Sequence, residues 1–210
     1  MEHIINKSFE KMISTYENTL NNFYPARGSS GFTEANQTHI YINALMHSLD
    51  DEKAVSWLEF PWESKEQHID GFVYSPKYKS VFYIEAKRLS HTKKKQEIIR
   101  DIERLYCPNK EFVTQCGIVD FDSEFVIALS DVWLETKWKK SMPEWWCGID
   151  NVPNQVKRWE SKKNVLIKPE STICSELKND WSASFRQAYW LGENVSSVSN
   201  YCLLMAASKI

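Results

Sequence analysis

Apolar and polar residues follow a helical period at the start of the chain. Residues 4–20 repeat apolar side chains every three or four positions, and residues 33–49 do so again after Thr33, a residue type that favours helix N-caps. Both segments are predicted to be amphipathic helices. The stretch between them, 25–32, holds a proline, two glycines and two serines, so we expect a loop there.

The period changes at residue 54. Three segments rich in β-branched and aromatic residues follow, at 54–60, 68–75 and 80–87, and the turn sequence PKYK joins the last two into a hairpin. Helical spacing returns at 93–106. Residues 124–133 are apolar on both sides, which is typical of a central strand. This order predicts an α/β fold in which helices flank a mixed β-sheet.

The pattern is less regular from residue 134 to 210. We expect a short strand at 164–168, a helical piece around 182–190, and a last buried strand at 201–208. Hydrophobic residues make up 42% of the 210 residues, enough to bury one sizeable core. With no compositional boundary, we predict a single domain with its core at about 33–133 and a C-terminal elaboration at 134–210.

Net charge and cysteine spacing limit the possible partners and locations of the protein only slightly. The formal net charge of −2 neither supports nor excludes a nucleic-acid partner, because a local basic patch can suffice. The five cysteines are scattered without a C-x-x-C pair, which favours reduced thiols and a cytoplasmic location. No apolar run approaches the ~20 residues of a membrane span, so we expect no membrane partner.

The segment FYIEAKRLS, residues 82–90, raises the main chemical question. Alternate residues of a strand share a face, so Glu85 and Lys87 point the same way. If the hairpin pairs around residues 76–79, Asp70 falls near Glu85 across the ladder, and two carboxylates converge with one ammonium group. Such a set suits Mg²⁺ or Mn²⁺ with a substrate phosphate, the lysine orienting a water or stabilising charge. The alternative is a salt bridge at the rim of the sheet.

The motif ID-x14-EAK, with Asp70, Glu85 and Lys87, resembles that of the PD-(D/E)xK nuclease superfamily. The predicted order over about 33–133 also resembles its restriction-endonuclease-like core of a helix, three antiparallel strands, a helix and a parallel strand. Ile69 stands where that family has a proline. The resemblance implies a nuclease in which Asp70 and Glu85 bind the metal ion and Lys87 acts on the attacking water.

The resemblance also draws attention to Glu34. Many proteins of this fold carry an extra acidic residue on the helix before the strands, and Glu34 matches that position, which implies an assisting catalytic role. The alternative is an acid in the first helical turn, favoured there by the helix dipole.

Basic residues follow the E-x-K motif and continue into the next predicted helix. A phosphodiester substrate needs such a patch beside the metal, so we predict nucleic-acid contacts from Arg88, Lys93, Lys94, Lys95, Gln96 and Arg100. The alternative is a solvated helix face balanced by neighbouring acids. The tryptophans pose a similar choice between base stacking and core packing, and Trp145-Trp146 beside a proline favours a packed corner.

The sequence thus predicts a Mg²⁺- or Mn²⁺-dependent endonuclease that acts on double-stranded DNA rather than RNA. A homodimer is compatible with cutting both strands of a duplex. One alternative is a catalytically inactive module that keeps the nuclease fold and binds nucleic acid or protein. A second is a structural protein whose Glu85 and Lys87 form only a rim salt bridge.

Overall fold

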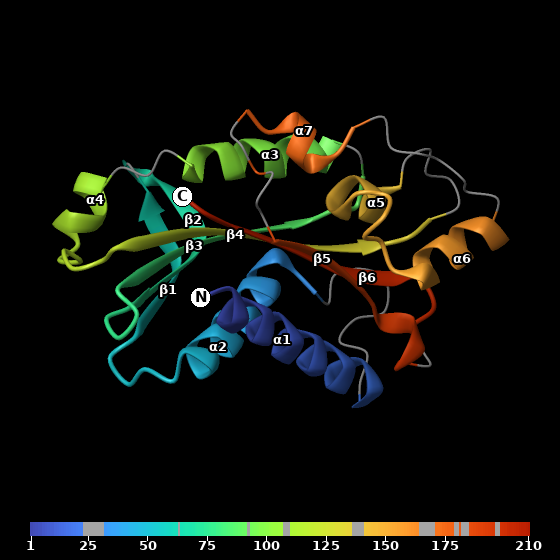
Figure 1. The fold of residues 1–210 in the computed structure, drawn as a ribbon, viewed down its shortest axis with the longest axis horizontal. Coiled ribbons are helices and arrows are strands. Elements are labelled where there is room, and N and C mark those ends of the chain that lie inside the picture. Colours follow the sequence, from blue (N-terminus) through green and yellow to red (C-terminus); the bar gives the residue numbers. More distant parts are fainter. Residues whose placement is uncertain are drawn as a thin grey trace.

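The protein has an α/β fold built on one mixed sheet with the strand order β1-β2-β3-β4-β6-β5 (Figure 1). Among the strands that the structure describes, β3 and β4 pair in parallel and the other neighbours are antiparallel. The computed structural model describes residues 1–22, 32–62, 64–91, 93–106, 110–135, 141–163, 171–178, 181, 185–195 and 198–210. The predicted mixed sheet flanked by helices is therefore confirmed.

Helices cover both faces of this sheet (Figure 1). Along the chain, the strands are β1 (Val55–Trp62), β2 (Ser64–Ser75), β3 (Ser80–Arg88), β4 (Ser123–Trp133), β5 (Phe185–Trp190) and β6 (Tyr201–Lys209). One face carries α1 (Glu2–Asn22) and α2 (Glu34–Leu49). The other carries α3 (Lys93–Leu105), α5 (Met142–Cys147) and α7 (Ile173–Glu176), while α4 (Lys110–Gln115) and α6 (Asn154–Lys162) lie toward its two ends.

The first two helices form where the sequence pattern predicts them. The hydroxyl oxygen of Thr33 accepts a hydrogen bond from the Asn36 amide at 3.2 Å, so Thr33 is the N-cap of α2. The predicted apolar positions of α1 are all buried: Ile5, Phe9, Met12, Ile13, Tyr16 and Leu20. The two helices pack on each other and on the sheet.

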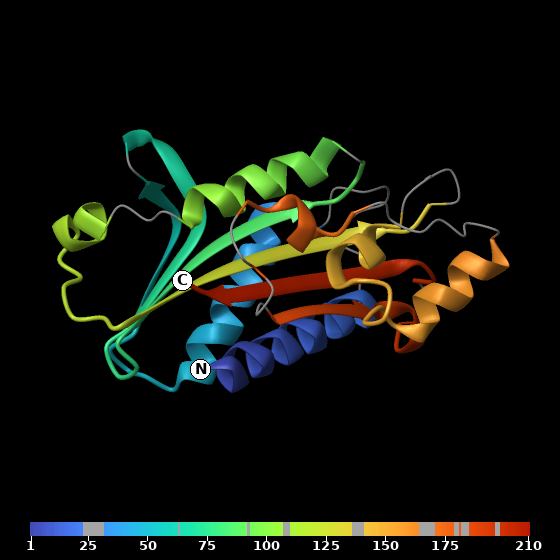
Figure 2. The same cartoon turned by 45° about the horizontal axis from the view of Figure 1, so that its top comes forward.

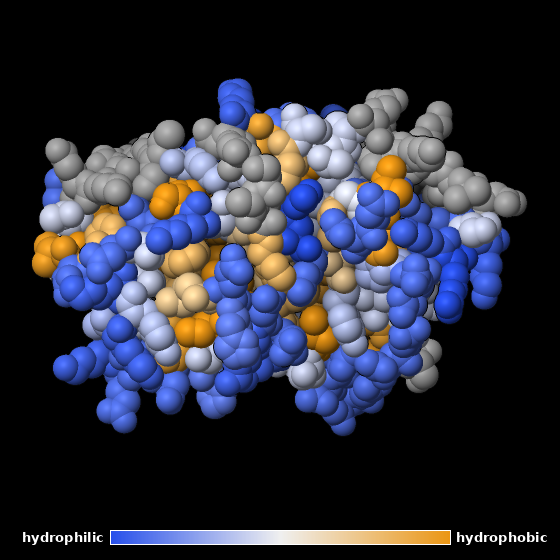
Figure 3. All heavy atoms as spheres, viewed as in Figure 1, coloured by the Kyte–Doolittle hydropathy of each residue, from blue (hydrophilic) through white to orange (hydrophobic). Residues whose placement is uncertain are grey.

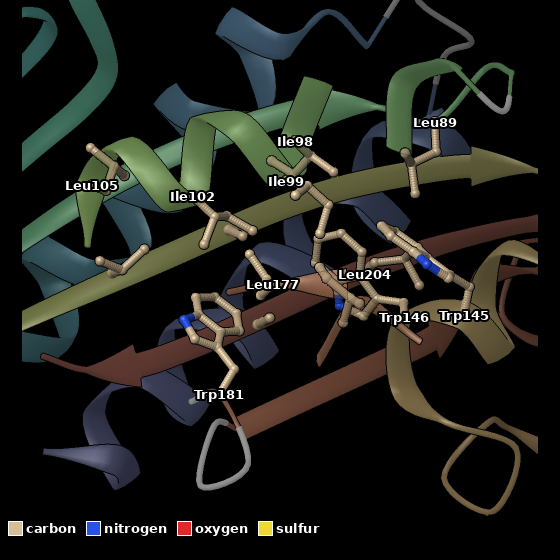
Figure 4. Close-up of a cluster of buried hydrophobic side chains, with 14 of the residues drawn as sticks. Leu89, Ile98, Ile99, Ile102, Leu105, Trp145, Trp146, Leu177, Trp181 and Leu204 are labelled. Atoms are coloured by element: carbon tan, nitrogen blue, oxygen red, sulfur yellow. The ribbon is translucent and has the colours of Figure 1, made fainter. Parts of the chain in front are cut away.

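Each face of the sheet has its own hydrophobic core, and β3 supplies both. Val81 and Tyr83 join the core under α3, whereas Phe82 and Ile84 join the core under α1 and α2. On the α3 face, Figure 4 shows the apolar side of α3 against a cluster of aromatic and aliphatic side chains that includes Trp145, Trp146, Trp181, Leu177 and Leu204. Trp145 and Trp146 are fully buried, as expected for a packed corner.

The C-terminal part belongs to the same sheet. The predicted last strand is confirmed as β6, which lies between β4 and β5. The helical piece predicted around 182–190 is wrong, because residues 185–190 form the edge strand β5 paired with β6. Every residue of β5 is partly buried, so it lacks the alternation by which a strand is recognised. The predicted strand at 164–168, and the loop at 25–32 apart from Phe32, lie outside the described residues.

The surface is mostly polar. In Figure 3 charged and polar side chains cover most of the visible face, and apolar side chains emerge in a band between the two helical layers. The cysteines at 116, 147, 174 and 202 are free thiols, and Cys107 lies outside the described residues. Within the ranges given above, no helix is both long and apolar enough to cross a membrane.

Candidate functional site

The sheet splits between β2 and β3, and the predicted catalytic residues lie at the split. The two strands pair from Ser75↔Ser80 only as far as Gly71↔Ile84. Beyond Gly71, β2 stays paired with β1, while β3 follows β4 to its end. Figure 2 shows β1 and β2 rising out of the sheet toward the level of α3. Asp70 and Glu85 are therefore the first residues past the last β2–β3 pair.

Beyond the split, two side-chain carboxylates accept the hydrogen bonds that β3 no longer makes to β2. Past the split, the amides of Ala86 and Arg88 have no β2 partner in the pairing register. Oδ2 of Asp70 accepts from the Ala86 amide at 2.7 Å, and Oε1 of Glu34 accepts from the Arg88 amide at 3.0 Å. These bonds satisfy backbone donors that burial would otherwise leave unpaired. They also fix both acids beside the end of β3.

Asp70 and Glu85 form a buried acidic pair. Glu85 is only 3% exposed, and the two carboxyl groups act on each other electrostatically. Burial raises the pKa of Glu85 to about 9, with the charges of Asp70 and Asp101 adding to the effect and Arg104 opposing it. Burial likewise raises the pKa of Asp70, against the bond from the Ala86 amide. Both shifts disfavour the state in which the two carboxyl groups are ionised together.

Lys87 lies between two acids from different helices. Its Nζ is 3.4 Å from Oε2 of Glu34 on α2 and 3.5 Å from Oδ2 of Asp101 on α3. Burial works against the charged form of Lys87, but Glu34, Asp101 and Asp70 outweigh it and raise the pKa of the amine. An ammonium group is thus held beside the acidic pair with 16% of its side chain exposed.

Arg104 is the other cation of the site. Its Nη2 is 2.5 Å from Oε1 of Glu85 and 3.1 Å from the carbonyl oxygen of His68. Helix α3 thus pairs crosswise with β3, Arg104 with Glu85 and Asp101 with Lys87. The sequence analysis did not place Arg104 or Asp101 in the site. Asp101 and Arg104 are three positions apart, so the sequence indicates that they share one side of the helix. It does not indicate which strand their side chains contact.

The close approach of α2 that brings Glu34 to this point depends on Gly71. A Cβ on Gly71 would lie 2.7 Å from Cδ1 of Ile42 and 2.8 Å from Cγ2 of Thr38, both side chains of α2. The side chains of Ile42 and Thr38 would have to shift to admit any larger residue. Glycine at this position therefore gives room for the helix carrying Glu34 to pack closely on the strand carrying Asp70.

The donor set fits a hard divalent cation. Over the residues with described side chains, His, Cys, Asp and Glu form no group of three or more arranged to hold a metal ion. Mg²⁺ and Mn²⁺ do not require one, since one or two carboxylates suffice when waters and substrate phosphates complete the shell. Asp70 and Glu85 supply two oxygen ligands whose mutual repulsion a cation would relieve. They are the residues that would hold it.

The six residues predicted to contact nucleic acid do not share one exposed surface. Arg88 turns to the opposite face of the sheet, 3.8 Å from a carboxylate oxygen of Asp131. Lys95 is buried, with Nζ 4.7 Å from the ring centre of Trp145. The other four are on α3: Lys94 bonds to Glu97, Gln96 bonds to Glu176 of α7, and Lys93 and Arg100 are exposed.

Comparisons with known proteins add no relative. No family model, no curated protein and no solved structure matches this chain. The resemblance to PD-(D/E)xK nucleases therefore stays a prediction based on Asp70, Glu85 and Lys87 and on the order of the elements around them.

Proposed function

We propose that the protein is a Mg²⁺- or Mn²⁺-dependent nuclease of the PD-(D/E)xK type that hydrolyses phosphodiester bonds. Its preferred substrate in this proposal is double-stranded DNA and not RNA. One observation carries this proposal. Asp70, Glu85 and Lys87 converge at the split between β2 and β3, with Glu34 joined to both Lys87 and the backbone of β3. Endonucleolytic cutting, and a dimer for cutting both strands, belong to the same proposal.

The residues divide the chemistry between them. A divalent cation held by Asp70 and Glu85 would polarise a phosphoryl oxygen and lower the pKa of a water. Lys87 supplies fixed positive charge next to that position, where it orients the water and stabilises the charge that develops on phosphorus. Glu34 and Asp101 fix the direction of the Lys87 side chain, with the Glu34 backbone bond at 3.0 Å tying the arrangement to β3.

The exposed basic side chains of α3 give partial support for a polyanionic substrate. Lys93 and Arg100 are exposed on the helix that covers the site, and Arg104 is partly exposed. Phosphate contacts from such residues supply affinity that does not depend on sequence. The three make a smaller basic surface than the six residues predicted from the sequence.

The test is a cleavage assay on plasmid, linear duplex, single-stranded DNA and RNA, each with Mn²⁺, with Mg²⁺ and with chelator. Wild type is expected to cut at least one of them in a metal-dependent manner. Lys87→Ala should lower the rate by about 10²–10³-fold at a temperature where circular dichroism shows the variant to be folded. Arg158→Gln, a change on the exposed face of α6 far along the chain, is the control. Metal-dependent cleavage by Lys87→Ala at the wild-type rate would contradict the assigned role.

A second candidate is a catalytically inactive module of the same fold that binds nucleic acid or protein. The crosswise pairs favour it, because Glu85 and Lys87 already have protein partners in Arg104, Asp101 and Glu34. Calorimetry separates the two candidates. No Mn²⁺ binding by wild type at millimolar concentration would favour the inactive module.

A further inference from the structure

The guanidinium group of Arg104 occupies the place beside Glu85 that a metal ion would need. Its Nη2 lies 2.5 Å from Oε1 of Glu85. A Mg²⁺ ion bound to a carboxylate oxygen sits at about 2.1 Å from it, and two cations so close to one carboxylate repel each other strongly. Metal binding therefore requires Arg104 to loosen its contact with Glu85.

Arg104 is placed to make such a move. The Glu85 side chain is 4% exposed and that of Arg104 is 28% exposed, so the arginine lies on the solvent side of the acid. Its second contact is a single bond to the carbonyl oxygen of His68, an exposed residue. The Nε atom is buried and makes no hydrogen bond. A guanidinium group has five donors, and this one leaves part of its capacity unused.

Lys87 is held more firmly in the site than Arg104. Two carboxylates from separate helices hold its ammonium group, at 3.4 and 3.5 Å. Displacing Lys87 would leave both acids unpaired, whereas displacing Arg104 leaves only Glu85, which the incoming cation would then neutralise. The site thus contains one cation fixed by two acids and one cation bound by a single acid.

We propose that Arg104 is an exchangeable cation that pairs with Glu85 in the metal-free protein and binds a phosphate oxygen of nucleic acid once a divalent cation occupies the site. Arginine suits the second role because its planar fork binds phosphate through two parallel hydrogen bonds. This inference rests on the proposed function. It adds a substrate-binding residue that the E-x-K motif does not contain.

The test measures metal binding and nucleic-acid binding separately. Mn²⁺ alone is titrated by calorimetry, and a short fluorescein-labelled duplex is titrated by anisotropy in Ca²⁺. Arg104→Gln removes the charge and keeps a donor for His68. We expect it to bind Mn²⁺ roughly tenfold more tightly, because a competing cation is gone, and the duplex roughly tenfold more weakly. Arg104→Lys keeps the charge and should leave the Mn²⁺ affinity near that of wild type.

Opposite changes in the two affinities distinguish exchange from a structural role. Arg158→Gln removes the same charge from the exposed surface of α6 and should change neither affinity. Weaker or unchanged Mn²⁺ binding by Arg104→Gln would overturn the inference, and so would unchanged duplex binding by this variant. In either case, Mn²⁺ binding by wild type would still support the proposed function. No Mn²⁺ binding by wild type would instead reject the proposed function.

A structure of the wild-type protein with Ca²⁺ provides a second measurement that does not depend on how any variant folds. We expect the Arg104 guanidinium to have left Glu85 when the ion is bound. An ion on Asp70 and Glu85 with the Arg104–Glu85 contact intact would refute the exchange.

Discussion

Two buried acids on neighbouring strands, Glu85 of β3 and Asp131 of β4, lie on opposite faces of the sheet and in different surroundings. Asp131 is fully buried under α1, where the Tyr201 hydroxyl donates to it and Tyr16 packs against Tyr201. Glu85 is nearly as buried, but its partners are Asp70 and the partly exposed Arg104. Burial raises the pKa of Asp131 to about 6 and that of Glu85 to about 9.

The comparison separates a structural acid from a candidate metal ligand. Asp131 accepts from the Tyr201 hydroxyl and lies 3.8 Å from Nε of Arg88, and its other influences come from the neutral Gln37 and the more distant charge of Glu34. Glu85 has a second carboxylate beside it and a cation on its solvent side. Like charges side by side cost stability unless a further cation binds, and this is the usual signature of a site rather than of a core.

The largest effect on stability is expected from Asp131→Ala. The change leaves the buried Tyr201 hydroxyl without its acceptor and Arg88 without its acid, so the free energy of unfolding should fall by about 3 kcal/mol. Glu85→Gln, which keeps the shape and removes the repulsion with Asp70, should change it by less than about 1 kcal/mol. Denaturant unfolding measures both. A larger loss from Glu85→Gln than from Asp131→Ala would reverse the comparison.

Gly71→Ala is expected to act on the site through packing. The new methyl group would press on Ile42 and Thr38, at 2.7 and 2.8 Å, and overpacking of this kind costs about 1–3 kcal/mol. Because α2 carries Glu34, we also expect slower cleavage at a temperature where the variant is folded. Stability and activity equal to wild type would show that α2 shifts without consequence for Glu34.

The last effect depends on pH and concerns a third buried acid, Glu160 of α6, which is 3% exposed. Burial raises its pKa to about 7. Because this pKa is above that of the unfolded chain, the folded state favours the protonated acid, and stability is lost as pH rises through about 7. Glu160→Gln should therefore unfold at a higher temperature than wild type at about pH 8 and at nearly the same temperature at about pH 5. An equal difference at both pH values would contradict this assignment.

Apart from the short helix α4, which was not predicted, the sequence predicts the elements up to β4 well because their periods are strong and their ends are marked. The helical repeat of α1, the Thr33 cap of α2 and the double-sided apolar strand β4 all have local causes. The edge strand β5 was missed for the opposite reason. Its apolar residues Phe185, Ala188 and Tyr189 have the spacing of a helical stripe, and the segment is a strand because it pairs with β6.

The site shows a similar division. The proximity of Asp70 to Glu85 follows from the hairpin register, which a turn of fixed position sets. The roles of Arg104 and Asp101 depend on how α3 docks over β3, and no local pattern encodes that docking angle. The same holds for Lys95, whose burial against Trp145 joins residues fifty positions apart. Long-range packing therefore decides which charges of α3 face the site.

Calorimetric titration of Mn²⁺ into wild type and Glu85→Gln tests the central claim, that Asp70 and Glu85 together hold a divalent cation, most directly. With no other divalent cation in solution, wild type should bind one Mn²⁺ ion. Glu85→Gln should lose that binding, and its unfolding profile should stay close to that of wild type. Binding of equal affinity in both proteins, or none in wild type at millimolar Mn²⁺, would contradict the claim.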